Sequence, residues 1–106
     1  MIYHVKAKFK TDTAKRLISR LNDGSIAKQR PDGAELVASM NRAVVNADGW
    51  VEWSEMCFCP TPLMHERATV LDQHFDQLKT RPIEAHSVYE GRSFMAYLQD
   101  LTKAAE

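Results

Sequence analysis

The sequence predicts an α+β fold in which helices cover an antiparallel sheet. Three features indicate this fold: alternating apolar and polar residues over residues 2–10, an apolar helical stripe that begins after residue 61, and a hairpin turn at residues 46–49. The chain has 106 residues, which is the size of one domain. We therefore expect residues 1–106 to form a single domain around one core.

The N-terminal segment is predicted to be a strand followed by a helix. Over residues 2–10 the apolar side chains fall on one face, and His4 and the lysines fall on the other, which is the pattern of a half-buried strand. Thr11 or Asp12 can cap the following helix, whose apolar positions recur at helical spacing. Residues 22–24 end in a glycine and offer a left-handed stop for that helix.

The middle of the chain is predicted to be a connector and a hairpin. Residues 25–33 end on a turn signal and are expected to connect two elements. Residues 34–42 fit both a helix and a strand, because their apolar residues match both periods. The hairpin signal at residues 46–49 favours the strand, so we predict a strand at residues 37–45 paired with a strand at residues 50–58.

The second half of the chain is predicted to contain a helix, a strand and a shorter helix. Thr61 can cap the first helix, Pro62 suits its first position, and apolar residues recur at helical spacing as far as Leu78. Residues 83–89 are predicted to form the last strand, and residues 94–101 the C-terminal helix. The order is β-α-β-β-α-β with an extra C-terminal helix, which is the ferredoxin-like arrangement with a four-stranded antiparallel sheet.

This order of elements, together with the opening Ile2-Tyr3-His4-Val5-Lys6, resembles the dimeric α+β barrel superfamily. That superfamily includes muconolactone isomerases and small cofactor-independent monooxygenases. The resemblance implies the fold and a homodimer. It implies no reaction, because residues 53–75 match no active-site pattern of the superfamily.

Composition and charge argue against several classes of partner. Fourteen basic residues balance 14 acidic ones, and Lys6, Lys8 and Lys10 are the only approach to a basic stripe, so we expect no nucleic acid as a partner. No stretch approaches the roughly 18 apolar residues of a membrane span, and the N-terminus lacks a signal peptide. The expectation is a cytoplasmic protein with no membrane partner.

The two cysteines, Cys57 and Cys59, are predicted to be reduced. A disulfide between residues separated by one strand residue would be strained. His65 could join them in a zinc site, but structural zinc normally takes four ligands and a wider cysteine spacing. No phosphate-binding loop, serine nucleophile motif or metalloprotease helix occurs in the sequence. We therefore expect no metal and no cofactor.

The predicted hairpin suggests a candidate binding site. Pairing residues 37–45 with residues 50–58 places Arg42 opposite Trp53, with Glu55 on the same face. A guanidinium over an indole beside a carboxylate can bind an anionic or carbonyl-bearing small molecule. An ordinary cross-strand ion pair is the alternative interpretation.

Three further residues are candidates for the same site. His4 lies on a strand expected to run antiparallel to residues 50–58 and can move protons near neutrality, although a structural role is the alternative. His65 and Arg67 lie in the first turn of the helix after Thr61, either at a pocket rim or on a solvated face.

Two functions are therefore expected from the sequence. The first is an enzyme or binding protein for a small carbonyl- or carboxylate-bearing metabolite, acting without a metal. The second is a non-catalytic oligomeric assembly or regulatory domain that buries a partner against Trp50, Met56 and Phe58. Both predict a homodimer or higher homo-oligomer, because helices would cover only one face of a sheet that is apolar on both. The proposed catalytic residues are His4 and Glu55, and the proposed substrate-binding residues are Arg42, Trp53, His65 and Arg67.

Overall fold

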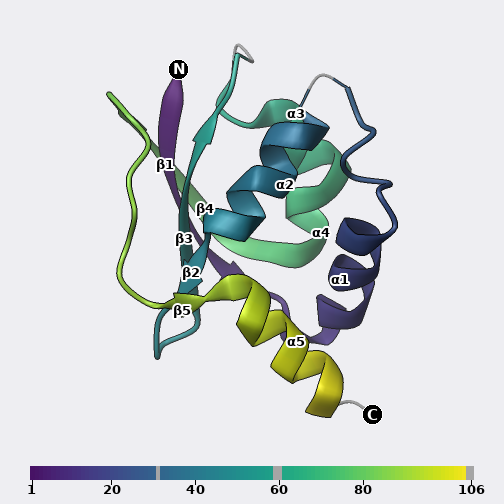
Figure 1. Ribbon diagram of the computed structural model, residues 1–106. Helices are drawn as coiled ribbons and strands as arrows, with labels where there is room; N and C mark the ends of the chain where they lie inside the picture. Colours follow the sequence, from purple (N-terminus) through teal and green to yellow (C-terminus); the bar gives the residue numbers. More distant parts are fainter. Residues whose placement is uncertain (31, 59–60, 105–106) are drawn as a thin grey trace.

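The computed structural model describes residues 1–30, 32–58 and 61–104. Over these residues the chain forms one antiparallel sheet of five strands, in the order β4-β1-β3-β2-β5, with helices on one of its faces (Figure 1). The strands are β1 (Ile2–Phe9), β2 (Val44–Val45), β3 (Trp50–Met56), β4 (Phe75–Ile83) and β5 (Arg92–Ser93). The predicted α+β class and the antiparallel sheet are confirmed, but the sheet has five strands rather than four.

The helical part of the described chain forms four segments. Two of the helices, α3 and α4, are joined by a π-helical turn at Arg67–Leu71 into one continuous segment. A 3-10 turn, Thr11–Thr13, precedes α1. The helices are α1 (Ala14–Asn22), α2 (Gly33–Arg42), α3 (Met64–Glu66), α4 (Asp72–His74) and α5 (Phe94–Ala104). No helix in the described ranges has both the length and the apolar composition needed to cross a membrane.

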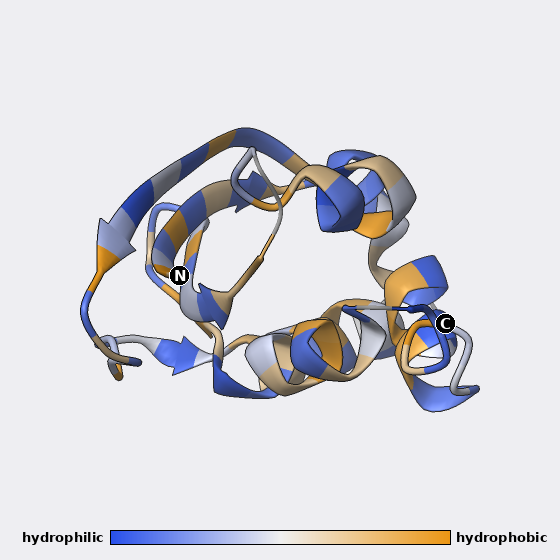
Figure 2. Cartoon of the chain, turned by 90° about the horizontal axis from the view of Figure 1, so that it is seen from above, coloured by the Kyte–Doolittle hydropathy of each residue, from blue (hydrophilic) through white to orange (hydrophobic). Residues whose placement is uncertain are grey.

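The central strand β1 confirms the alternation seen in the sequence. Its burial alternates residue by residue, with Tyr3, Val5, Ala7 and Phe9 facing the helices. Because β1 pairs with β3 on one side and β4 on the other, it decides which residues of both neighbours face the core. Seen from above, the sheet curves around one side of the molecule and the helices close the other side (Figure 2).

The predicted strand at residues 37–45 is wrong for most of its length. Residues 33–42 form helix α2, and only Val44 and Val45 are in a strand. The helical period prevails because it buries Leu36 and Met40 together on one face. The turn was correctly predicted, since Asn46 Oδ1 accepts hydrogen bonds from the backbone N–H groups of Asp48 and Trp50.

Helix α2 takes over part of the role that a longer β2 would have had. Because β2 has only two residues, the part of β3 beyond Glu52 has no strand partner on that side among the described residues. The carbonyl of Ser54 instead accepts a hydrogen bond from Arg42 Nη2 at 2.8 Å and a longer one from Ser39 Oγ at 3.4 Å. Side chains of α2 therefore satisfy backbone that the missing strand would have paired.

The predicted helix as far as Leu78 ends early, at His74, and the predicted strand at residues 83–89 is also wrong. The chain extends at Phe75 to form β4, whose residues pair with β1 as far as Ile83. Tertiary packing explains the change, because the Phe75 ring lies in an aromatic cluster at 5.2–5.8 Å from three other rings. Pro82 is tolerated because β4 is an edge strand.

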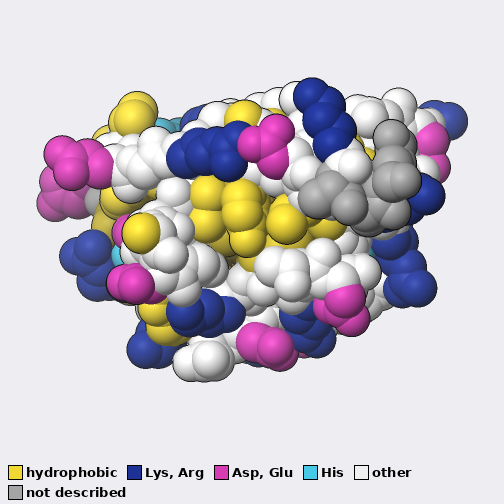
Figure 3. Space-filling model, turned by 90° about the horizontal axis from the view of Figure 1, so that it is seen from below, with side chains coloured by type: hydrophobic (Ala, Val, Ile, Leu, Met, Phe, Trp, Pro, Cys, Tyr) yellow, Lys and Arg dark blue, Asp and Glu magenta, His cyan; other side chains and the backbone are white. Residues whose placement is uncertain are grey.

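Residues 84–91, which we call the strap, form no strand and cross the outer face of the sheet, away from the helices (Figure 1). Their contacts with β3 include hydrogen bonds between Ser54 Oγ and the strap residues His86 and Ser87. The strap leads into β5 and the predicted C-terminal helix, which is confirmed as α5. At the α5 end of the molecule, hydrophobic side chains reach the surface between charged ones (Figure 3).

Gly33, the first residue of α2, packs closely against residues 26 and 27 of the connector that precedes the helix. A Cβ atom at this buried position would lie 2.1 Å from the backbone oxygen of Ile26 and 2.9 Å from that of Ala27. Helix propensity favours Gly33→Ala, whereas the clash opposes it. We expect the clash to dominate and the free energy of unfolding, measured by urea denaturation, to fall by about 2 kcal/mol.

The neighbouring Ala34→Gly variant is the matched control, because Ala34 is exposed and its change carries only the propensity cost of about 1 kcal/mol. A stabilised Gly33→Ala protein would contradict the close approach of α2 to residues 26 and 27.

Candidate functional site

Two predicted site residues, Trp53 and Glu55, lie together on the inner face of β3. They are two positions apart on one strand, so both point toward the helices. Both side chains are fully buried, and Trp53 Nε1 donates a hydrogen bond to Glu55 Oε1 at 2.8 Å. The sequence prediction that these residues share a face is confirmed.

No local pattern in the sequence indicates that Glu66 is a partner of Glu55. Glu66 lies on α3 and is 1% exposed, while Glu55 is 0% exposed. Glu55 Oε2 and both carboxyl oxygens of Glu66 find no hydrogen-bond donor in the described ranges. A buried carboxylate without a donor is costly, so a proton retained by this pair would stabilise it.

The electrostatics of Glu55 support proton retention. Burial is the largest effect and raises the pKa of Glu55 well above its usual value, while the hydrogen bond from Trp53 opposes this shift. The Glu66 carboxyl raises the pKa of Glu55 further, because a proton on Glu55 can be shared with Glu66 and because two carboxylates repel each other, and Glu35 adds a smaller repulsion. We call Glu55 and Glu66 the acid pair.

The backbone around Glu66 is irregular on both sides. Leu63, three residues earlier, is buried in the left-handed region with φ 57° and ψ 23°, which is unfavourable for a branched side chain. The π-helical turn Arg67–Leu71 begins directly after Glu66. Left-handed non-glycine residues and π-turns are both frequent at functional sites.

Arg42 does not lie on a strand opposite Trp53, so the predicted cross-strand arrangement is wrong. It ends helix α2 and reaches β3 from there, at the carbonyl of Ser54. The same Nη2 atom donates to Glu35 Oε1 at 2.8 Å. Arg42 Nε is buried and has no hydrogen-bond partner among the described residues. The contacts of the Arg42 side chain therefore join α2 to β3.

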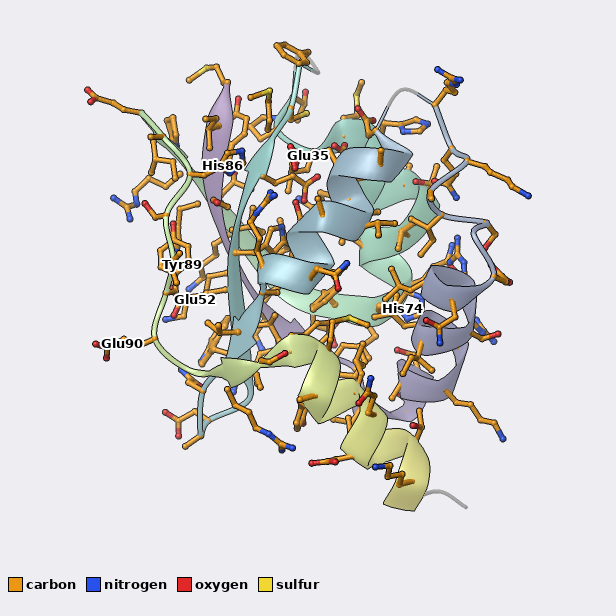
Figure 4. All side chains as sticks on the ribbon, in the orientation of Figure 1. Glu35, Glu52, His74, His86, Tyr89 and Glu90 are labelled. Carbon is orange, nitrogen blue, oxygen red and sulfur yellow. The ribbon has the colours of Figure 1, made fainter. Side chains whose placement is uncertain are left out.

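His4 lies on the opposite face of the sheet from the acid pair. The antiparallel pairing with β3 is as predicted, and His4 is opposite Ser54. However, His4 Nε2 donates to Glu52 Oε2 at 2.8 Å, and its ring lies 4.9 Å from that of Tyr89. In Figure 4, Glu52 and Tyr89 lie on the strap side of the sheet, away from the helices. His4 and Glu55 therefore do not form one site.

A polar contact joins β3 to the strap. Ser54 Oγ is fully buried and hydrogen-bonded to His86 Nδ1 at 2.8 Å, and His86 is labelled beside the sheet in Figure 4. Only the fold brings these two residues together, because no local pattern links positions so far apart in the sequence.

His65 and Arg67 flank Glu66 but engage other carboxylates. His65 Nδ1 lies 2.9 Å from Asp32 Oδ2, and Arg67 Nε donates to Asp72 Oδ1 at 3.1 Å. Neither has a contact with the acid pair among the described interactions, so these two predicted binding residues do not join it.

The predicted absence of a metal remains a prediction. Cys57 is buried, whereas Cys59 lies outside the described residues. Across the ranges that the structure describes, no group of three or more His, Cys, Asp or Glu side chains is arranged to hold a metal ion.

His74, the last residue of α4, is a further buried polar group (Figure 4). The Thr13 hydroxyl donates to the carbonyl of Lys10, so His74 Nδ1 must carry the proton that bonds to Thr13 Oγ1 at 2.8 Å. His74 Nε2 is buried without a partner in the described chain. Burial, followed by repulsion from Arg20, Arg16 and Lys10, lowers the pKa of His74 to about 4.

This arrangement predicts loss of stability as the pH falls. A folded pKa of about 4 against 6.5 means that the unfolded chain binds the proton first, so stability is complete above pH 6.5 and declines toward pH 4. The shift corresponds to roughly 3 kcal/mol. In His74→Asn, whose amide can still donate to Thr13, the difference from wild type should shrink by this amount between pH 7 and pH 4. Urea denaturation at each pH measures it, and a difference that is independent of pH would show that His74 is not held neutral.

The chain was also compared with known proteins. No protein-family model matches it, and neither a curated protein nor a solved structure gives a significant match.

Proposed function

We propose that the acid pair, Glu55 and Glu66, is an acid–base site for a small carbonyl- or carboxylate-bearing molecule and acts without a metal. The observation that carries the proposal is the burial of two neighbouring carboxyl groups with three oxygens that lack donors. Such an arrangement is costly for stability alone, and costly buried polar groups are typical of functional sites.

The pair can supply both roles that proton transfer requires. Glu55, the member with the raised pKa, would remain protonated and donate a hydrogen bond to a ligand carbonyl or carboxylate oxygen. Glu66 would accept a proton from the ligand as the general base. The indole N–H of Trp53 would hold the orientation of the Glu55 carboxyl group, as it does through the 2.8 Å hydrogen bond.

Access to the pair would come from the end of β3 and the start of α3. Phe58 and Met64 are exposed there, and the strained Leu63 lies between this end and Glu66. A change of Leu63 to an ordinary backbone conformation would relieve strain and move α3 relative to β3. Substrate-binding roles for Arg42, His65 and Arg67 and a catalytic role for His4 have no support from contacts with the pair.

A ligand screen tests this function. Short keto acids, dicarboxylic acids and lactones should include compounds that raise the thermal midpoint of the wild-type protein, and Glu55→Gln and Glu66→Gln should each weaken their binding at least tenfold. The loss is expected because Gln can neither give up nor accept the proton at neutral pH. Glu90→Gln, at an exposed strap residue, is the control and should bind as wild type does.

The pH dependence of stability in Glu55→Gln tests the acid pair even when no compound in the screen binds. Since the folded pKa of Glu55 is raised, its stabilising effect is present below the unfolded pKa and is lost as the pH rises through the folded pKa. Glu55→Gln should therefore lack this loss of stability at higher pH. The acid–base function is refuted if this pH effect is present but every binding compound binds equally well to both Gln variants.

We also propose that the chain is related to the dimeric α+β barrels and forms a homodimer. The order of the strands β4-β1-β3-β2 is compatible with a ferredoxin-like fold, although α2, β5 and α5 are additions to it. An exposed apolar end favours self-association, since Phe58 is 84% exposed and Met56 lies nearby on β3. This observation also supports the alternative function of a non-catalytic assembly domain.

Light scattering after size exclusion tests the dimer. Wild type should elute with twice the mass of one chain, and Phe58→Ser should shift the population to monomers because it removes exposed apolar surface. The control is Val88→Ser, at a more exposed apolar residue on the strap. A wild-type monomer at micromolar concentration would rule out both the dimer and the assembly function.

A further inference from the structure

The outer face of the sheet gathers three lysines around one indole. Lys6 and Lys8 come from β1, and Lys79 comes from β4. Their ammonium groups lie 5.1, 4.9 and 5.5 Å from the centroid of the Trp50 ring. We call Lys6, Lys8, Trp50 and Lys79 the basic aromatic surface.

The lysines of this surface form no ion pair with a carboxylate among the described residues. Within the same part of the chain, Lys8 Nζ bonds only to the backbone oxygen of Asp48. The acidic side chains of the same face are engaged elsewhere. Glu52 accepts a hydrogen bond from His4, and Asp76 lies 3.6 Å from Lys10.

The register of the sheet concentrates the charge. Lys6 and Lys79 lie directly opposite each other in the β1–β4 pair, and Trp50 is opposite Lys8 in the β1–β3 pair. Like charges at directly opposed positions destabilise a sheet. Glu52 lies opposite Lys6 and Asp76 lies opposite Lys8, but these carboxylates pair with His4 and Lys10, which are outside this surface. The repulsion between Lys6 and Lys79 is therefore not offset by an ion pair of either lysine among the described residues, which favours a role in binding a partner.

The basic aromatic surface is not covered by the helices or by the described contacts of the strap. The helices pack on the other face of the sheet, and the strap contacts the outer face at Ser54 and His4, further along β3 and β1 from Trp50 (Figure 1). Trp50 itself is half-buried and Lys79 is exposed. A sheet face that combines an aromatic ring with unpaired cations is the usual composition of surfaces that bind single-stranded nucleic acid.

We propose that the basic aromatic surface binds single-stranded nucleic acid, with a base stacked at Trp50 and phosphates held by Lys6, Lys8 and Lys79. The overall balance of charge had argued against such a partner, but the sequence does not reveal that the fold adds Lys79 and Trp50 to the lysines of β1. The proposal is independent of the acid pair, which lies on the opposite face of the same sheet.

Fluorescence anisotropy with labelled RNA and DNA single strands of about 12 nucleotides of mixed sequence tests the proposal. Binding is expected with a micromolar dissociation constant at low salt. The logarithm of the affinity should fall with the logarithm of salt concentration with a slope of about −2, since each neutralised phosphate of a single strand contributes about −0.7. Lys6→Ala and Lys79→Ala should each reduce that slope by about 0.7.

Trp50 variants test the stacking contribution separately from charge. Trp50→Ala should weaken binding about tenfold and leave the salt slope unchanged, whereas Trp50→Phe should bind nearly as wild type does. Lys28→Ala, at an exposed lysine in the connector before α2, is the matched control and should alter neither value. Circular dichroism of each variant checks that the sheet is intact.

Several outcomes would overturn the proposal. They are no binding at about 100 μM protein and low salt, an equal loss of affinity in Lys28→Ala and Lys79→Ala, and equal binding of duplex and single strands. Equal competition by polyglutamate would also overturn it, because the surface would then recognise charge without bases.

Discussion

The structure depends on the double pairing of β1 at the centre of the sheet. With β3 on one side and β4 on the other, the alternation of β1 fixes which of the residues paired with it face the core, although the β1–β4 register shifts between Lys6 and Lys8. Because Val5 faces the core, its register partner Trp53 does too, and Glu55 follows two positions later. A slip of β3 by one residue against β1 would exchange the faces of β3, moving Glu55 toward solvent and Trp50 toward the core.

The same sheet carries two different chemistries because its faces have different neighbours. Helices α2 and α3 enclose the inner face, where Glu55 and Glu66 are removed from water. This burial raises the pKa of Glu55. Solvent reaches much of the outer face, where lysine ammonium groups remain hydrated near Trp50. The backbone of the sheet separates the acid pair from the basic aromatic surface. A side chain on one face can therefore be changed with little direct effect on the other face.

Helix α2 explains why the inner face is polar at its centre. A full-length β2 would have completed the sheet beside β3, but the short β2 leaves the Ser54 carbonyl to be satisfied by Arg42. This brings the helix, with its Glu35, alongside the end of β3 that carries Glu55. The irregular backbone from Leu63 through the π-turn then brings Glu66 in from the other side.

The sequence alone determined the α+β class, strands β1 and β3, helices α1 and α5 and the turn before Trp50, because each depends on a local period or on turn chemistry. Tertiary structure decided the rest. Residues 34–42 fit both the helical and the strand period, and packing against β3 favours the helix. Phe75 continues the apolar helical stripe in the sequence, but its packing in the aromatic cluster favours its place in β4. Glu55 was identified as a candidate from its strand, whereas its pairing with Glu66 joins elements that no local pattern relates, so only the folded chain could reveal it.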